Sequence, residues 1–167
     1  MKKTLSVLIC RSLLCYLILS SCNSSAQTQL LDAISSKDIC ISGVLIEADK
    51  SVLLKNFGKP DSIISRINEF EGTEFRQFVY LNSTFSISGN RFANFNLRDR
   101  AFQFDYGEIR VGDPEEKIRN IFPQSYSKRE IRGSKVTIRV KVTDIDSYIL
   151  FTSENGVVIR IHSWDDM

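Results

Sequence analysis

The chain has 167 residues, with 22 lysines and arginines, 20 acidic residues and a single histidine. This length is enough for one domain with a substantial core, and the near balance of charge excludes the strong positive field of a typical nucleic-acid-binding protein. The sequence has no glycine-rich phosphate loop, no nucleophile elbow and too few cysteines and histidines for a zinc site. We therefore expect no cofactor, no metal and no nucleic-acid partner.

Residues 1–21 have the pattern of a secretory signal peptide. Two lysines follow the initiator methionine, and the apolar stretch at 13–19 is too short to cross a bilayer as a helix, which needs about 20 apolar residues. The stretch ends in Leu-Ser-Ser-Cys at 19–22, which resembles the lipobox of bacterial lipoproteins. Cys22 is therefore the predicted lipidation site and mature N-terminus, and cleavage after Ala26 without lipidation is the alternative.

Removing residues 1–21 leaves 146 residues with 19 basic and 20 acidic side chains, so the positive excess belongs to the leader. Residues 22–37 are predicted to be the lipidated cysteine and a flexible tether, and residues 38–167 a single domain. If Cys22 is lipidated, Cys40 has no partner and is expected to behave as a small buried hydrophobe. Without lipidation, a disulfide between the two would be possible.

The first predicted helix covers 49–57. Asp49 is a suitable N-cap, while Gly58 and Pro60 are stop signals. Leu53 and Phe57 lie four residues apart and would share the buried face.

The second predicted helix covers 113–122 and ends at Pro123. Asp113 is the expected N-cap, Pro114 suits the first helical position and Glu116 would complete a capping box. Both helices are about three turns long, so each needs a sheet against which to bury its apolar stripe.

Alternation of apolar and polar residues predicts strands over most of the remaining domain. The sequence Asn155-Gly156 between two such runs is a strong hairpin signal. Alternation also places His162 on the same face as Val158 and Arg160. The predicted strands are 39–46, 75–81, 84–88, 91–97, 102–104, 108–111, 136–142, 147–153 and 157–163.

The two helices begin at Asp49 and Asp113, 64 residues apart, and strands follow each of them. This pattern predicts an α+β fold made of two tandem helix-plus-antiparallel-strand repeats, at about 38–106 and 107–167. Together they would form one curved sheet with two short helices on one face.

Three features together resemble a known group of envelope proteins: the lipobox, the polar tether and the helix-bounding segments 53–60 and 111–118. They resemble the SmpA/OmlA-type small envelope lipoproteins and the related tandem-repeat proteins built like the beta-lactamase inhibitory protein. The chain departs from the family pattern in two places. The family has a glycine before each helix, whereas this chain has Ala48 before its first helix, and Phe122-Pro123 stands in place of the second glycine stop. The resemblance implies a helix-plus-sheet repeat that binds other proteins without catalysis, and it transfers no functional residue.

Aromatic residues are concentrated in the central strands, and most are expected in the core. Phe78 and Tyr80 share one face by alternation and are predicted to form an interaction surface on the free face of the sheet, with Arg91, Arg98 and Arg100 as its rim. The full aromatic set is Phe70, Phe75, Phe78, Tyr80, Phe85, Phe92, Phe95, Phe102, Phe104 and Tyr106.

The sequence thus predicts a non-catalytic, membrane-tethered lipoprotein that binds another envelope protein. Asn23 after the lipidation site favours, by analogy with sorting in enteric bacteria, the outer membrane facing the periplasm. One alternative is a carrier of a small apolar ligand or lipid in a groove between helices and sheet. The other is an unrecognised hydrolase using His162 or Asp144, although Asp144 is more simply a turn residue.

Overall fold

The structure, a computed structural model, describes residues 31–67 and 74–165. The predicted signal peptide (1–21), the lipidation site Cys22, the sorting residue Asn23 and the aromatic residue Phe70 lie outside the described residues. Those predictions therefore stay predictions.

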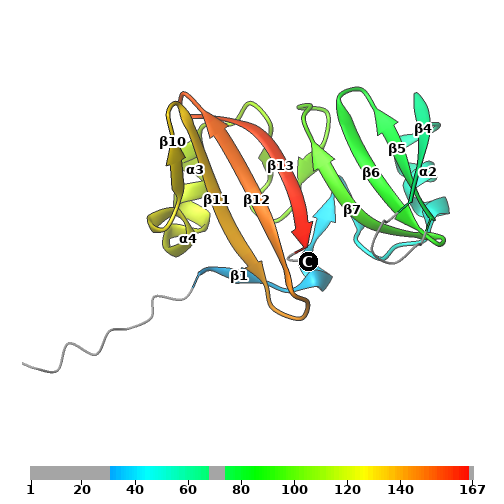
Figure 1. Cartoon of the computed structure of the whole chain (residues 1–167), viewed down its shortest axis with the longest axis horizontal. Coiled ribbons are helices and arrows are strands. Elements are labelled where there is room, and N and C mark those ends of the chain that lie inside the picture. The colour runs from blue at the N-terminus through cyan, green and yellow to red at the C-terminus, as the bar shows by residue number, and fades with distance from the viewer. Residues whose placement is uncertain (1–30, 68–73, 166–167) are drawn as a thin grey trace, which may run out of the picture.

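A nine-stranded sheet forms the body of the protein (Figure 1). Its strand order is β1-β11-β12-β13-β7-β6-β5-β4, with β10 paired to β11 at one end. All pairs are antiparallel except β1 with β11, which is parallel. The strands are β1 (Ala33–Ile34), β4 (Ser62–Ile67), β5 (Glu74–Tyr80), β6 (Ser83–Ser88), β7 (Arg91–Leu97), β10 (Glu130–Arg132), β11 (Lys135–Val142), β12 (Ser147–Glu154) and β13 (Val157–Asp165).

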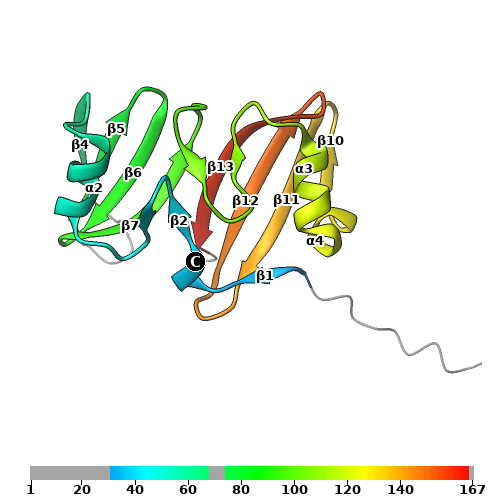
Figure 2. The ribbon, with the colours of Figure 1, turned by 180° about the vertical axis from the view of Figure 1, so that it is seen from behind.

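A second, four-stranded sheet and three α-helices cover one face of the large sheet, and Figure 2 shows all of them on the same side. The small sheet has the order β3-β2-β8-β9, and Figure 1 shows the opposite face of the large sheet without a covering helix. The covering elements are η1 (Ser36–Asp38), β2 (Cys40–Ile41), β3 (Val44–Leu45), α2 (Lys50–Phe57), β8 (Gln103–Phe104), β9 (Ile109–Arg110), α3 (Glu115–Ile121) and α4 (Pro123–Ser127).

Matching backbone hydrogen bonds in the two halves confirm the predicted tandem repeat. In the first half, Glu47 N–H donates to Phe92 O over 2.8 Å, and Phe92 N–H donates to Ala48 O over 2.9 Å. In the second half, Gly112 N–H donates to Val158 O over 2.7 Å, and Val158 N–H donates to Asp113 O over 2.9 Å. Each half therefore ties the residues before its helix to the start of its last strand, and the fold is α+β as predicted.

The two halves join through both sheets. In the large sheet, β7 pairs with β13 through Leu97 opposite Ile161 and Asn96 opposite His162. In the small sheet, β2 pairs with β8 through Ile41 opposite Phe104. The hairpin β8–β9 that opens the second repeat begins at Gln103, which lies before the predicted division at 106/107.

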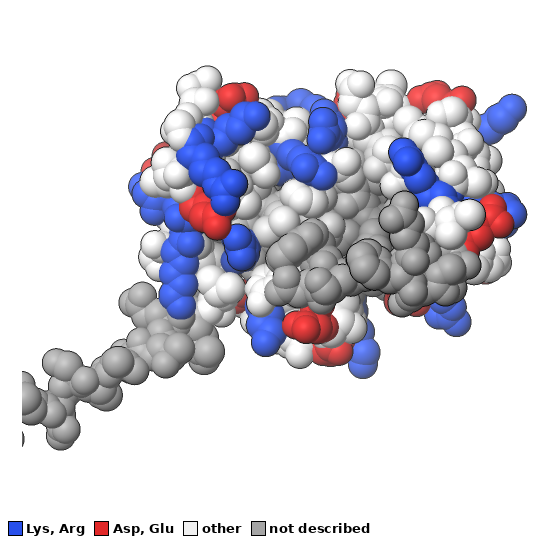
Figure 3. Space-filling view, in the orientation of Figure 1, with Lys and Arg blue, Asp and Glu red and all other residues white. Residues whose placement is uncertain are grey.

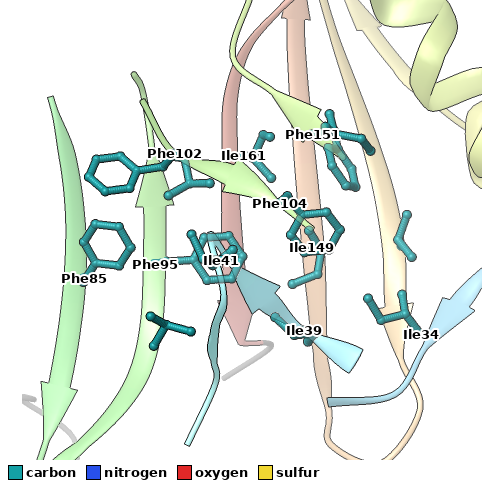
Figure 4. Packing of buried hydrophobic residues seen from close by; sticks show 14 of the residues in the cluster. Ile34, Ile39, Ile41, Phe85, Phe95, Phe102, Phe104, Ile149, Phe151 and Ile161 are labelled. Atoms are coloured by element: carbon teal, nitrogen blue, oxygen red, sulfur yellow. The ribbon is translucent and has the colours of Figure 1, made fainter. Parts of the chain in front are cut away.

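The core lies between the large sheet and its covering layer (Figure 4). Aromatic rings fill much of it: the Phe85 and Phe102 centroids are 5.0 Å apart, and those of Phe104 and Phe151 are 5.5 Å apart. Phe57 from α2 lies 5.1 Å from the Phe85 ring. Burial of these large side chains is the main stabilising contribution, at roughly 25 cal/mol per Å² of apolar surface.

The first helix has the predicted limits. The Asp49 carboxylate accepts a hydrogen bond from Ser51 N–H over 2.8 Å, and the chain leaves the helix through Gly58, whose φ is 78°. The hairpin at Asn155-Gly156 is also confirmed, with φ of 51° and 77° at the two residues. Both features depend on local backbone chemistry. The helix ends at a glycine because its φ is positive, and the hairpin has Asn-Gly because φ is positive at two consecutive residues.

The start of the second helix differs from the prediction. Pro114 is the N-cap residue and no side chain caps the helix, while Glu116 pairs with Arg119 and closes no capping box. The reason is that Pro114 has an extended conformation (ψ 139°), which moves the start of the helix one residue along the chain. Pro123 ends α3 but also opens α4, where it occupies the first turn.

The structure differs from the sequence prediction at four further elements: the β2–β3 hairpin, β4, β10 and β1. The predicted opening strand 39–46 is a tight hairpin, because the chain turns at Ser42 and Gly43 with φ of 46° and 83°. Strands β4 and β10 lie at the two ends of the large sheet and carry no clear alternation in the sequence. Within the predicted tether, Ala33–Ile34 form β1 and Ile34 is buried, so this stretch belongs to the folded unit.

Candidate functional site: the open face of the large sheet

The candidate functional surface is the face of the large sheet that points away from the helices and the small sheet. We call it the open face. Its residues alternate with buried ones along each strand, because successive side chains point to opposite sides. From β11 through β13 to β7, they are Lys135, Thr137, Arg139, Lys141, Tyr148, Leu150, Thr152, Glu154, Arg160, His162, Asn94, Asn96 and, directly after β7, Arg98.

The predicted aromatic surface is corrected by the structure. Phe78 and Tyr80 are 3% and 5% exposed and lie on the inner face of β5, where Phe78 is opposite Phe85. Tyr80 donates a hydrogen bond to Gly58 O over 2.9 Å, and burial together with the charge of Asp61 raises its pKa to about 12. Alternation correctly placed the two rings on one face, but the covering layer packs against that face.

The three predicted rim arginines lie in different places. Arg91 is at the start of β7, 4.0 Å from the Glu47 carboxylate, and Arg100 is 3.5 Å from Asp113. Arg98 directly follows β7 on the open face, where the register of β7 with β13 places it next to Arg160. The predicted rim therefore does not exist as a unit, and one member belongs to a different cluster.

That cluster lies at the join between the two repeats. Asn96 and His162 are directly opposite each other on β7 and β13, and Arg160 precedes His162 by two residues on the same face. The Arg160 Nε donates to Asn96 Oδ1 over 2.7 Å. We call Asn96, Arg98, Arg160 and His162 the junction cluster.

The prediction for His162 was right about Arg160 and wrong about Val158. Val158 is buried, because a β-bulge at Thr152 and Ser153 shifts the register between β12 and β13. One extra residue in a strand reverses the faces beyond it. The bulge therefore separates Val158 from the open face while His162 remains on it.

The electrostatics of the junction cluster are unusual. Burial, with smaller contributions from the positive charges of Arg160 and Arg98, lowers the pKa of His162 to about 4. Burial and the charge of Arg98 also lower the pKa of Arg160. Within the described part of the chain, no carboxylate pairs with Arg98 or Arg160. His162 is thus neutral at pH 7 and lies beside two cations.

The lowered pKa of His162 predicts a specific pH dependence. In the unfolded chain, the His162 imidazole has a pKa of about 6.5 and is protonated below that pH. In the folded chain, the same imidazole is not protonated until the pH falls to about 4. Stability is therefore lost as pH falls from 7 towards 4, and His162→Gln should remove this component. We expect the wild type to lose about 1 kcal/mol more than His162→Gln between pH 7 and pH 5, allowing for solvent screening at a half-buried site. Urea unfolding of both proteins at the two pH values measures it, and equal losses would contradict it.

Positive charge continues from the junction cluster along β11. Lys135, Arg139 and Lys141 alternate along the open face of this strand, and Figure 3 shows lysine and arginine side chains gathered over β10 and β11. Glu130 of β10 neutralises part of this charge, with 2.9 Å to Arg139 and 3.2 Å to Arg132. The open face as a whole is polar and carries more cations than anions.

Two further polar residues, Glu115 and Asp144, have structural partners. Glu115 is buried and accepts hydrogen bonds from Ser153 and from Tyr126, the latter over 2.9 Å. Asp144 accepts hydrogen bonds from Ser36 N–H over 2.8 Å and from the Ser36 hydroxyl, which lower its pKa and anchor η1. The two residues nominated for a hydrolase, His162 and Asp144, therefore have separate environments.

Cys40 is half-buried in β2, and its pKa is raised to about 11 by burial and by the side chain of Asp105. The thiol is therefore protonated at neutral pH, consistent with an unreactive side chain. Among residues 31–67 and 74–165, no group of three potential metal ligands comes together. No helix in the described segments is long and apolar enough to cross a membrane.

Comparisons with known proteins show only distant likeness. No protein-family model matches the chain, and no curated protein matches it in sequence. A solved structure of a cysteine-rich secretory protein from Staphylococcus aureus subsp. aureus Mu50 superposes with a TM-score of 0.49 at 15% identity, over 82% of this chain and 50% of that one. The chain thus spans about half the length of that protein.

A proposed beta-lactamase inhibitor protein from Streptococcus mutans superposes with a TM-score of 0.29 at 15% identity, over 71% of this chain and 83% of that one. It carries the name of the inhibitor type that the sequence resembles, while the SmpA/OmlA-type resemblance stays a prediction. Both likenesses are too distant to assign a function to this chain.

The sequence missed Asn96 and Arg160 as candidate site residues. Each reads as an ordinary outward residue of a strand, and they meet only because β7 pairs with β13 across the two repeats. The available signal was the outward alternation of both strands, which indicates a face but not a neighbour.

Proposed function

We propose that this chain is a non-catalytic, lipid-anchored envelope protein that binds another envelope protein through its open face. The observation that carries the proposal is the combination of a broad sheet face, on which the described residues place no helix and no second sheet, and a junction cluster whose two arginines have no carboxylate partner among the described residues. Uncovered sheet faces with buried polar anchors are suited to recognition of a partner.

The charge of the open face indicates the chemistry of that partner. Lys135, Arg139, Lys141, Arg98 and Arg160 lie on this face. Its acidic residues in the described segments are Glu130, which pairs with Arg139 and Arg132, and Glu154, which accepts a hydrogen bond from Ser134. Complementary charge favours an acidic protein segment and speeds its encounter with this surface. The proposed partner therefore presents acidic residues to the open face.

The lipid anchor rests on the leader and on Cys22 alone. Asn23 and the polar residues that follow would hold the domain near the outer membrane, on its periplasmic side. The β1 strand, which pairs with β11 at Lys141, then sets where the tether meets the domain, at one end of the large sheet.

The carrier alternative has no observation in its favour. The space between α2 and the sheet, where an apolar ligand would bind, is occupied by the packed rings of Phe57, Tyr80, Phe85 and Phe102, with centroid separations of 5.0 to 6.2 Å. A ligand there would have to displace well-packed core side chains, which is costly.

In-cell photo-crosslinking tests the proposal. A photoreactive residue at Thr152, on the open face, should capture one dominant envelope protein, whereas the same residue at Asn56, exposed on α2, should not. Cys22→Ser should release the protein from the membrane fraction and reduce the crosslinked yield, because the tether raises the local concentration of an envelope partner. Equal capture from both positions, or none from Thr152, would reject the open face as the binding surface.

A further inference from the structure

We propose that Arg98 and Arg160 form an oxyanion-binding subsite on the open face, which receives a carboxylate from the acidic partner. The inference rests on the proposed function for the identity of the partner. The subsite itself rests on the arrangement of the junction cluster.

The first argument is the register. Asn96 is opposite His162, and Leu97 is opposite Ile161, in the antiparallel pairing of β7 with β13. Continuing this register by one residue places Arg98 opposite Arg160, on the open face. Like charges directly opposite each other on neighbouring strands are unfavourable. An anion bound between two arginines in this arrangement would offset their repulsion.

The second argument is the orientation of the Arg160 guanidinium. Its Nε donates to Asn96 Oδ1 over 2.7 Å, which fixes the plane of the group against the sheet. No hydrogen bond or ion pair occupies its two Nη atoms within the described residues. Those atoms form the fork with which arginine binds a carboxylate through two parallel hydrogen bonds. Arg98 is exposed, so its long side chain can close on the same anion from the other strand.

The third argument is the lack of a competing negative charge. His162 on β13 is neutral at pH 7, and Leu150 of β12, which is opposite His162, is buried and apolar. In the described part of the molecule, His162 Nδ1 is also buried without a hydrogen-bond partner. Among the described residues, the charged groups that face His162 are thus Arg160 on its own strand and Arg98, which follows β7. A half-buried arginine such as Arg160 binds an anion more strongly than an exposed lysine does.

His162 provides the test, because it is the one histidine in the chain and its ring signals are unambiguous in an NMR titration. A bound carboxylate would offset the two positive charges and raise the pKa of His162 by about 1. The probe is a synthetic heptapeptide of glutamates, added to the folded chain without its leader at low salt. Vesicles of phosphatidylglycerol form a second arm, since a lipid phosphate presents the same oxyanion chemistry.

Arg160→Gln and Arg98→Gln should each weaken peptide binding at least about tenfold and abolish the peptide-dependent rise in the pKa of His162. Arg91→Gln is the matched control, because Arg91 is an exposed arginine at the other end of β7 and should leave both readouts unchanged. No shift with either probe, or a shift that survives Arg160→Gln, overturns the subsite. A shift with vesicles and none with the peptide overturns the assignment to an acidic protein.

The two proposals can fail separately. Peptide binding at Arg98 and Arg160 without a crosslinked partner in cells would support the proposed subsite and reject the proposed protein-binding function. A partner that is still crosslinked in the Arg160→Gln variant would support the proposed protein-binding function and reject the subsite as the place where the partner binds.

Discussion

Phe78→Ala is expected to lower the free energy of unfolding by about 3–5 kcal/mol, as large-to-small substitutions of buried phenylalanines do. Phe78 lies on the inner face of β5, between Ile63 of β4 and Phe85 of β6, and is almost fully buried. The substitution removes packed apolar surface and leaves a cavity that rigid neighbouring rings cannot fill. Urea denaturation should show a lower midpoint at an unchanged slope.

Phe75→Ala is the matched control, because Phe75 is on the same strand but on the opposite face and is half-buried. Its loss should be about 1 kcal/mol, within the range of ordinary partly exposed positions. If both variants lost the same stability, the inner and outer faces of β5 would be wrongly assigned. A stable Phe78→Ala protein that no longer crosslinked a partner would instead support the aromatic interaction surface that the sequence predicts.

The features that the sequence predicted correctly are those that depend on a few neighbouring residues. Asp49 caps α2 and Gly58 ends it, because the cap needs only a nearby N–H and the exit needs only a positive φ. The Asn155-Gly156 hairpin formed for the same reason. The tandem repeat followed from the spacing of two such helices, which each need an equivalent sheet to cover.

The features that the sequence could not predict depend on pairing between distant segments. Alternation put Phe78 and Tyr80 on one face, but it cannot tell which face the helices cover. The bulge opposite Val158 reverses the expected faces at the start of β13, and the register shift opposite Ser86 and Ile87 does the same at the start of β7. No residue type marks either bulge in the sequence.

The candidate site was the least predictable part. Arg98 was named for its proximity in sequence to aromatic strands, whereas its actual neighbour Arg160 comes from the other repeat. That contact requires the β7–β13 pairing, which no local signal specifies. The join between repeats is also where a duplicated fold has a surface that neither repeat has alone, so this is a reasonable place for a binding site to arise.

Asp113→Ala should be the second large effect, with a loss of about 2–3 kcal/mol in the free energy of unfolding, because it removes hydrogen bonds to a buried carboxylate and leaves a donor without a partner. Asp113 is 7% exposed, and its carboxylate accepts from Arg110 N–H over 3.0 Å and from Lys117 Nζ over 3.0 Å. Its backbone carbonyl oxygen accepts a hydrogen bond from Val158 N–H of β13 over 2.9 Å. The residue thus ties the small sheet, α3 and the large sheet together.

The ionised form of Asp113 carries this effect. Burial raises its pKa, but the hydrogen bonds from Lys117 and Arg110 and the nearby charges outweigh burial, and the net pKa is lowered. The contribution is therefore complete above the pKa of the unfolded carboxyl, about 3.9, and is lost as pH falls through the lower folded value. Thermal or urea unfolding at pH 7 and at pH 3 measures both aspects.

Glu116→Ala is the control for Asp113→Ala, since Glu116 is exposed and pairs with Arg119 on the helix surface. Its loss should be about 0.3 kcal/mol, as for other exposed helical ion pairs. A loss at Glu116 equal to that at Asp113 would mean that the capping box predicted from the sequence forms in solution. A small loss at Asp113 would mean that the link between α3 and β13 is held by the backbone alone, and that the second repeat keeps its helix in place without the carboxylate.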